Sequence, residues 1–312
     1  MRILTFDLED WFHLLEFPGT ESMDSWDSFE ARVDHGTDLI LESLDHHGVK
    51  ASFFCLGWIA DRHPAVIRRI DAAGHEFGTH GYGHRLVRDM TPETFEADLV
   101  RSLAAIESAL GRKVRHYRAP GFSITATTTW ALPILLEHGI EVDSSIFPSR
   151  RAHGGFPGAP GEPCWVVWRG GRIRELPLAV GRLGAARVPF SGGGYFRLMP
   201  YDVSRRIVRR SPYVMTYFHP RDFDTGQPML PGLGPVRKFR AYVGLGSALA
   251  KLRRLLAEFD FIDVSTAAER IDWASAPSFA VEGRVPGSAR PVTIETGADL
   301  VPKAAETAET GT

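Results

Sequence analysis

Short β-rich runs alternate with amphipathic segments along most of the chain. The β-rich runs, bounded by turn-forming residues, predict strands over 3–6, 51–56, 76–79, 114–118, 140–143, 173–176, 214–218 and 259–264. Between them, apolar residues at helical spacing predict helices over 34–45, 64–73, 91–110, 201–208 and 247–258. This alternation indicates a mostly parallel sheet that is closed or nearly closed.

The segment 91–110 carries the clearest helix signals. Thr91 suits the N-cap, Pro92 the first helical position and Gly111 the residue past the end. The pattern loosens between residues 147 and 189, where pairs of Gly and Pro predict loops and one hairpin through 165–176. Such an irregular stretch inside a compact domain is typical of a functional loop or lid.

The two ends of the chain differ in character. The first predicted strand begins almost at Met1 and lacks the pattern of a secretory signal, so we expect a cytoplasmic protein. From residue 275 onward the sequence is rich in Ala, Thr, Gly, Pro and Glu and buries little apolar surface. We therefore expect one folded domain over 1–274 and a flexible tail over 275–312.

Composition excludes several classes of protein. The 36 basic and 38 acidic residues among 312 leave a net charge of −2, which argues against nucleic-acid binding. The two cysteines, Cys55 and Cys164, form neither a disulfide framework nor a zinc pattern. No apolar run is long enough to cross a bilayer.

Ionisable residues follow several predicted strands, where a barrel of this class places its active site. Asp7, Glu9 and Asp10 follow the first strand, and His80 and His84 follow the third. Two histidines four residues apart and one carboxylate make a facial triad for a divalent ion, with open positions for water and substrate.

Three further strands end in candidate catalytic residues. Arg118 follows the fourth strand and is suited to hold a carboxylate. Asp143 ends the fifth strand, and His219 follows the strand through Tyr217 and is suited to acid–base work. Polar groups at so many strand ends favour a catalytic site over unrelated surface residues.

Taken together, these motifs resemble the polysaccharide deacetylases of carbohydrate esterase family four, the NodB-homology group. The order of the motifs matches over about residues 1–225, and the first is similar to the Asp-x-Glu-Asp branch found in bacterial surface polysaccharide clusters. The matching segments read DLEDWF at 7–12, SFF at 52–54, GW at 57–58, THGYGH at 79–84, RAPGFS at 118–123, DSSIFP at 143–148, GGYFR at 193–197 and FHP at 218–220. The resemblance implies an α/β fold: a distorted (β/α) barrel of about seven strands in a single domain.

The resemblance also implies roles for individual residues. Asp7 matches the catalytic base, Arg118 the arginine that holds it, and His219 the catalytic acid. Asp143 matches the residue that orients the acid. The matching metal ligands are His80, His84 and one carboxylate.

This chain departs from the family pattern in two motifs. Leu8 separates the first two carboxylates, so the metal ligand is either Glu9, which shares a strand face with Asp7, or Asp10, which has the usual side-chain length and which we favour slightly. Gly121 replaces the usual aromatic residue of the third motif. Its N–H remains a candidate oxyanion donor, with Phe122, Tyr82 and Tyr217 as candidate substrate contacts.

The implied activity is metal-dependent removal of an N-acetyl group from a sugar of a bacterial surface polysaccharide or its precursor, lipid- or nucleotide-linked. Zn²⁺ is favoured over Co²⁺, Ni²⁺ or Mn²⁺. A metal-dependent amidohydrolase acting on a small non-glycan amide is the first alternative, and a non-catalytic carbohydrate-binding protein the second. The pattern leaves the sugar and the oligomeric state open.

Basic residues gather in three predicted helical stretches of the last third of the chain, over 205–210, 237–240 and 251–254. Such runs are usually solvated helix faces. The alternative is that they contact an anionic membrane surface from the cytoplasmic side.

Overall fold

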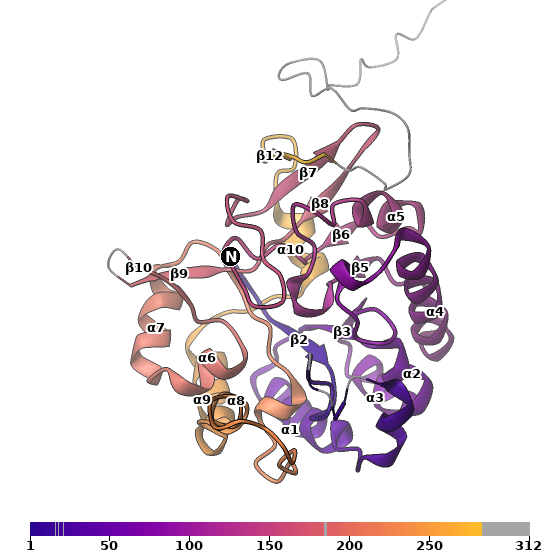
Figure 1. The fold of residues 1–312 in the computed structure, drawn as a ribbon. Helices are drawn as coiled ribbons and strands as arrows, with labels where there is room; N and C mark the ends of the chain where they lie inside the picture. The colour runs from indigo at the N-terminus through magenta and orange to yellow at the C-terminus, as the bar shows by residue number, and fades with distance from the viewer. Residues whose placement is uncertain (16, 18, 21, 184–185, 283–312) are drawn as a thin grey trace, which may run out of the picture.

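A computed structural model describes residues 1–282, apart from residues 16, 18, 21 and 184–185. Its main sheet has the strand order β12-β7-β8-β6-β5-β4-β3-β2 (Figure 1). The five strands β2 (Thr5–Leu8), β3 (Ser52–Cys55), β4 (Glu76–Thr79), β5 (His116–Tyr117) and β6 (Val142–Asp143) are parallel, and β8 (Gly171–Glu175) continues them. β7 (Cys164–Trp168) pairs antiparallel with β8, as the predicted hairpin requires.

The N-terminal segment pairs with other strands on both of its sides, so the sheet curls toward a closed barrel. β1 (Arg2–Ile3), directly before β2, pairs in parallel with β11 (Val214–Met215), and Phe6 and Phe218 form a further parallel bridge. Gly192, which follows the hairpin of β9 (Val180–Leu183) and β10 (Ala186–Pro189) along the chain, bridges to Tyr217. Isolated bridges replace a regular ladder on this side, so the predicted distorted α/β barrel is confirmed.

Helices and short 3-10 turns connect the strands and cover the barrel (Figure 1). The helices are α1 (Val33–His47), α2 (Gly57–Arg62), α3 (Pro64–Ala72), α4 (Pro92–Leu110), α5 (Ala131–Glu137), α6 (Gly193–Leu198), α7 (Tyr201–Arg210), α8 (Pro235–Tyr242), α9 (Leu245–Glu258) and α10 (Val264–Arg270). The 3-10 turns are η1 (Met23–Ser28), η2 (Val87–Asp89), η3 (Pro120–Phe122) and η4 (Pro220–Asp222). Among the described residues, none of these helices is both long and apolar enough to cross a membrane.

Helix α4 shows how local sequence sets an element. The Thr91 hydroxyl accepts a hydrogen bond from the N–H of Thr94, and Gly111 ends the helix with a left-handed φ of 70°. Phe95, Leu99 and other apolar side chains on one face pack into the core. The predicted cap, start and end are all present, because each depends only on neighbouring residues.

The strand predicted over 259–264 is wrong. Asp263 accepts a hydrogen bond from the N–H of Thr266 and thereby caps α10. Only Ile262 retains a bridge, to Ile3. An aspartate that caps a helix competes with strand formation, and here the cap prevails.

The folded chain extends past the predicted boundary at residue 274. β12 (Ser278–Ala280) pairs in parallel with residues 165–167 of β7, and Phe279 packs on Phe156 with ring centroids 5.1 Å apart. The exposed edge of β7 offers unpaired backbone groups, which recruit this segment despite its polar composition. The rest of the predicted tail, 283–312, lies outside the described residues.

Candidate functional site

Ionisable side chains converge where β2, β4 and β5 end and where the chain leaves β11. They line a cavity of about 340 Å³ that includes Asp7, Glu9, His80, His84 and His219. Parallel strands present their carboxyl ends on one side of the sheet, so residues distant in sequence meet there.

Glu9 lies between the two histidines of the third motif. Its Oε1 is 3.2 Å from Nε2 of His80 and 3.0 Å from Nε2 of His84. Nδ1 of His80 is 2.7 Å from the carbonyl oxygen of Arg118. A carbonyl only accepts, so Nδ1 donates a hydrogen bond to it, and this contact aims Nε2 at Glu9. Burial alone would raise the pKa of Glu9, but His84, His219 and His80 outweigh it and hold that pKa well below its usual range.

Asp10, which we favoured slightly as the metal ligand, lies outside this cluster. Its Oδ2 accepts hydrogen bonds from the N–H groups of Arg32 and Val33 at 2.8 and 3.0 Å, and its Oδ1 accepts one from Trp11. The chain turns after Leu8 and aims this side chain at the start of α1. Both oxygens therefore serve the backbone, and Glu9 takes the place in the histidine cluster.

Arg118 holds Asp7 from inside the barrel. The guanidinium is fully buried, and its Nη1 donates to Oδ1 of Asp7 at 2.6 Å and to the hydroxyl of Thr5 at 2.7 Å. Further donors reach the carbonyl and hydroxyl of Ser144. The other oxygen of Asp7, Oδ2, lies 3.8 Å from Nε2 of His219 and faces the cavity.

His219 is oriented by Asp222, which the sequence analysis missed. Nδ1 of His219 is 3.1 Å from Oδ2 of Asp222, whose Oδ1 is 3.0 Å from Nε of the buried Arg197. Burial alone would lower the pKa of His219, but the carboxylates of Glu9, Asp222 and Asp7 outweigh it and raise that pKa to about 9. The available signal was an acidic residue three positions after a histidine that is followed by proline, which suits a 3-10 turn.

Asp143, predicted to orient His219, instead belongs to a separate buried pair. Its Oδ1 accepts hydrogen bonds from the N–H of Ser144 and the hydroxyl of Ser145. Its other oxygen and Oε2 of Glu175 are buried and lack a donor among the described residues. Burial raises the pKa of Asp143 to about 6 and, together with Asp143 itself, that of Glu175 well above its usual range. The two carboxyl groups therefore share a proton beneath the site.

This shared proton predicts a pH-dependent stability. A carboxyl group whose pKa is raised on folding favours the folded state below its unfolded pKa, and that contribution is lost as the pH rises through the folded value. Glu175→Gln supplies a permanent N–H donor to Asp143. We compare the free energy of unfolding of this variant with that of wild type at each pH. The difference in favour of the variant should be larger at pH 8 than at pH 5 by about 1 kcal/mol or more. Urea unfolding at both pH values measures this, and a difference independent of pH would contradict the shared proton.

The candidate substrate contacts divide into two groups. Gly121, Phe122 and Tyr217 line the cavity, and the rings of Phe122 and Tyr217 meet edge to face with centroids 5.1 Å apart. The Tyr217 hydroxyl is buried and has no hydrogen-bond partner among the described residues. Tyr82 is not a cavity residue: its hydroxyl donates to Asp61. The turn through Gly81 and Gly83 directs this ring away from the cavity, and the ring is buried beneath the guanidinium of Arg101.

The loops that carry the site hold unusual backbone conformations. His84 and Phe122 are the two residues other than glycine with a positive φ in the described chain, at 50° and 55°. Asp98 accepts hydrogen bonds from the N–H groups of Tyr82 and Gly83 and so braces the loop before His84. Backbone strain of this kind persists where the surrounding contacts determine the position of a side chain.

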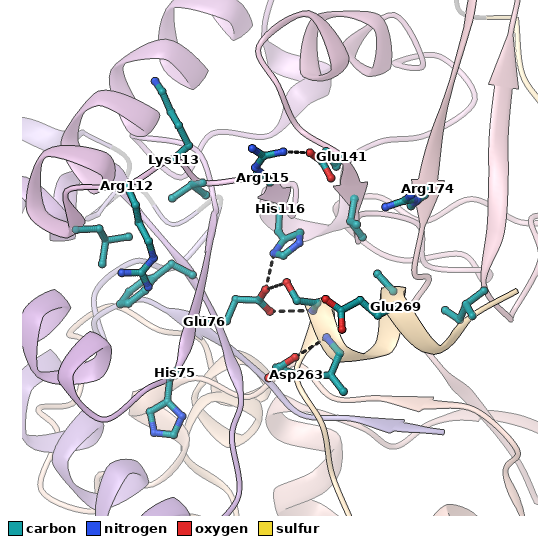
Figure 2. Close-up of a pocket in the computed structure, with 18 of the residues that line it drawn as sticks. His75, Glu76, Arg112, Lys113, Arg115, His116, Glu141, Arg174, Asp263 and Glu269 are labelled. Atoms are coloured by element: carbon teal, nitrogen blue, oxygen red, sulfur yellow. Dashed lines mark hydrogen bonds and ion pairs between the residues drawn. The ribbon is translucent and has the colours of Figure 1, made fainter. Parts of the chain in front are cut away.

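A larger cavity of about 670 Å³ lies at the opposite, amino-terminal ends of β4 and β5 (Figure 2). Figure 2 shows two contacts between its charged groups: His116 contacts Glu76, and Arg115 pairs with Glu141. Glu76 also accepts hydrogen bonds from the N–H groups of Val264 and Ser265. These contacts join α10 to the sheet, so we assign this cavity a structural role.

Comparison with known proteins divides the chain into two matched segments. Residues 24–141 match the polysaccharide deacetylase family model, and residues 144–269 match one described as a domain of unknown function, DUF3473. His80, His84 and Arg118 fall in the first segment, and His219 and Asp222 in the second. Asp7 and Glu9 precede both. The candidate site therefore combines three parts of the chain.

Curated relatives match over part of their length. A peptidoglycan-N-acetylglucosamine deacetylase of Bacillus cereus is 30% identical over 92 residues, which are 28% of this chain and 34% of that protein. A chitooligosaccharide deacetylase of Sinorhizobium fredii is 36% identical over 89 residues, which are 27% of this chain and 40% of that protein. The chain thus spans only about a third to two fifths of these relatives.

One solved structure is similar over nearly the whole chain. A Mycobacterium smegmatis protein, provisionally described as a polysaccharide deacetylase, has a TM-score of 0.61 with 21% identity, covering 95% of this chain and 93% of that one. This similarity concerns the fold. The family match covers residues 24–141, and this part of the chain is a polysaccharide deacetylase domain.

Proposed function

We propose that this protein is a metal-dependent deacetylase that hydrolyses the N-acetyl group of a sugar in a bacterial surface polysaccharide or its precursor. The observation that carries the proposal is one cavity in which Glu9, His80 and His84 lie beside a held carboxylate, Asp7, and an oriented imidazole, His219. The peptidoglycan and chitooligosaccharide deacetylases among the relatives support an N-acetylated glycan as the substrate.

The donor set fits a divalent cation. One ligand atom each from Glu9, His80 and His84 lies within 4.8 Å of the other two. Two imidazoles and one carboxylate suit Zn²⁺, which we propose as the native ion. When bound, such an ion polarises both a water molecule and the acetamide carbonyl.

Asp7 and His219 are placed to move the two protons of hydrolysis. Asp7 accepts a proton from the attacking water, whose oxygen forms a bond to the carbonyl carbon. His219, whose pKa of about 9 keeps it protonated near neutral pH, donates a proton to the amide nitrogen. The C–N bond then breaks, which releases acetate and the amino sugar. Arg118 holds Asp7 in place through its hydrogen bond to Oδ1, and the N–H of Gly121 is a candidate donor to the oxyanion.

The proposal is tested by acetate release from the purified protein. The substrates are chitooligosaccharides, peptidoglycan and nucleotide-linked and lipid-linked N-acetylhexosamine, each with chelator-treated protein and again after Zn²⁺ is restored. We expect zinc-dependent release from at least one glycan. Release only from small non-glycan amides would support the amidohydrolase alternative. Glycan binding without any release would support the non-catalytic one.

Asp222 provides a prediction about pH. Asp222→Asn removes a carboxylate that raises the pKa of His219, so the imidazole loses its proton at lower pH. Because the acid must be protonated, activity falls as the pH rises through this pKa, and we expect the alkaline limb of the kcat profile to move to lower pH. Asp143→Asn is the matched control and should leave that limb in place. Equal shifts in both variants would contradict the assignment of Asp222.

A further inference from the structure

We propose that α6, α8 and the loop before α8 form a docking surface for an anionic lipid bilayer beside the mouth of the cavity. The inference rests on the proposed function, because it specifies that the glycan is presented at a membrane surface. We call this region the α8 surface and define it by Tyr195, Leu198, Met229, Val236, Lys238, Phe239 and Arg240.

Exposed apolar side chains concentrate in this region. Five of the eight large hydrophobic residues that are exposed in the described chain belong to the α8 surface. Val236 and Phe239 are 63% and 57% exposed and lie three residues apart, on one side of the helix. α8 buries none of its side chains. A helix with solvent-exposed apolar side chains next to a cavity indicates a binding surface.

The charge of the region is uniformly positive. Between Asp224 and Glu258 the sequence contains six basic residues and no acidic one. The side chains of Lys238 and Arg240, both exposed, make no ion pair or hydrogen bond with other described residues. A basic and apolar helix attracts anionic lipid headgroups and inserts its apolar side chains between them.

Several residues of the other predicted basic stretches make contacts within the fold. On α9, Lys251 donates to the carbonyl oxygens of Arg197 and Met199, and Arg253 pairs with Glu42. Arg205 of α7 pairs with Glu258. Arg206, Arg209 and Arg210 of α7 are exposed as well, but among the described residues neither α7 nor α9 carries an exposed large hydrophobic side chain. Of the three stretches, α8 alone combines exposed basic and exposed large apolar residues.

The α8 surface adjoins the candidate active site. Leu233, Arg237 and Ala241, from α8 and the loop before it, line the cavity together with His219. The Arg197 side chain, which also contacts Asp222, donates to the carbonyl of Ala241. Figure 1 shows α8 beside α6 and α9 at the edge of the molecule. A bilayer on this surface would bring a membrane-held glycan next to His219.

Charge favours a bilayer over a second copy of the chain. In a twofold dimer through α8, each basic surface would face its own copy, which carries no carboxylate between Asp224 and Glu258 to compensate it. Anionic lipid supplies the opposite charge together with an apolar interior.

The test is sedimentation of the full chain with vesicles that contain no glycan. We expect binding to phosphatidylcholine vesicles that include phosphatidylglycerol, weakening with salt, and little binding to phosphatidylcholine alone. Val236→Ser/Phe239→Ser should bind about tenfold more weakly. Val100→Ser/Leu136→Ser, which alters exposed apolar residues on α4 and α5, is the matched control and should bind like wild type. Equal binding to both vesicle types, equal loss in both variants, or a vesicle-independent dimer abolished by Val236→Ser/Phe239→Ser would overturn the proposal.

Docking and catalysis are measured separately. Neither Val236 nor Phe239 lines the cavity, so their variant should release acetate from soluble chitooligosaccharides within about twofold of wild type while losing activity on vesicle-held substrate. Normal vesicle binding by a protein that releases no acetate from any glycan would contradict the proposed function and leave docking supported. Full activity without vesicle binding would overturn docking alone.

Discussion

Asp7→Asn is expected to lower kcat for acetate release by about two to four orders of magnitude, the usual contribution of a positioned general base. Asparagine keeps the shape of the side chain and an oxygen for Arg118, but it cannot accept the proton of the attacking water. One oxygen of the carboxylate lies 2.6 Å from Nη1 of Arg118 and the other faces His219. The measurement is kcat with zinc-loaded protein.

The control for this variant separates chemistry from folding. Arg118 is fully buried and loses its charged partner, so some loss of stability is expected. Thermal unfolding and zinc content must therefore be measured alongside kcat. A folded, zinc-loaded Asp7→Asn protein with near wild-type activity would rule Asp7 out as the base.

Glu9→Gln and Asp10→Asn are expected to have opposite effects, although each exchanges one carboxylate for an amide. Glu9 lies against both histidines, so its loss should weaken zinc binding by at least about tenfold and remove most of the activity. Asp10 accepts three backbone N–H bonds. In Asp10→Asn the amide NH2 group would face backbone N–H donors. This should lower the free energy of unfolding by about 1 kcal/mol or more, with zinc binding retained.

Zinc titration and urea unfolding of both variants test this contrast. The expected pattern is loss of metal in Glu9→Gln and loss of stability in Asp10→Asn. The reverse pattern would restore Asp10 as the ligand. Equal zinc affinity in wild type and both variants would place the metal elsewhere.

The corrections to the metal ligand and to the partner of His219 have one physical origin. The predicted strands indicate which residues lie at each strand end. On that basis Asp7, His80, Arg118 and His219 were expected on one side of the sheet. A predicted strand does not indicate how the chain turns beyond its end. After Leu8 the turn directs Glu9 inward and Asp10 to α1, where backbone donors stabilise its carboxylate.

The partner of His219 illustrates the same limit. Asp143 ends a parallel strand, as expected, but its side chain faces the serines that follow it and Glu175. Asp222 occupies the orienting position because the turn η4 folds it back onto the ring of His219. A contact three residues away depends on local turn geometry, for which the sequence offers only a weak signal.

Local sequence patterns were enough to predict the alternation of strands and helices, the caps of α4 and the set of strand-end residues from which the site is built. These features depend on periodicity and on contacts between near neighbours, which a linear pattern records. Tertiary contacts were needed to choose Glu9 over Asp10, to replace Asp143 with Asp222, to place Tyr82 in the core away from the cavity and to pair β12 with β7. The positions of the polar side chains depend on which hydrogen-bond donors and acceptors meet across the fold. A buried polar group needs a hydrogen-bond partner, and that partner is often distant in the sequence.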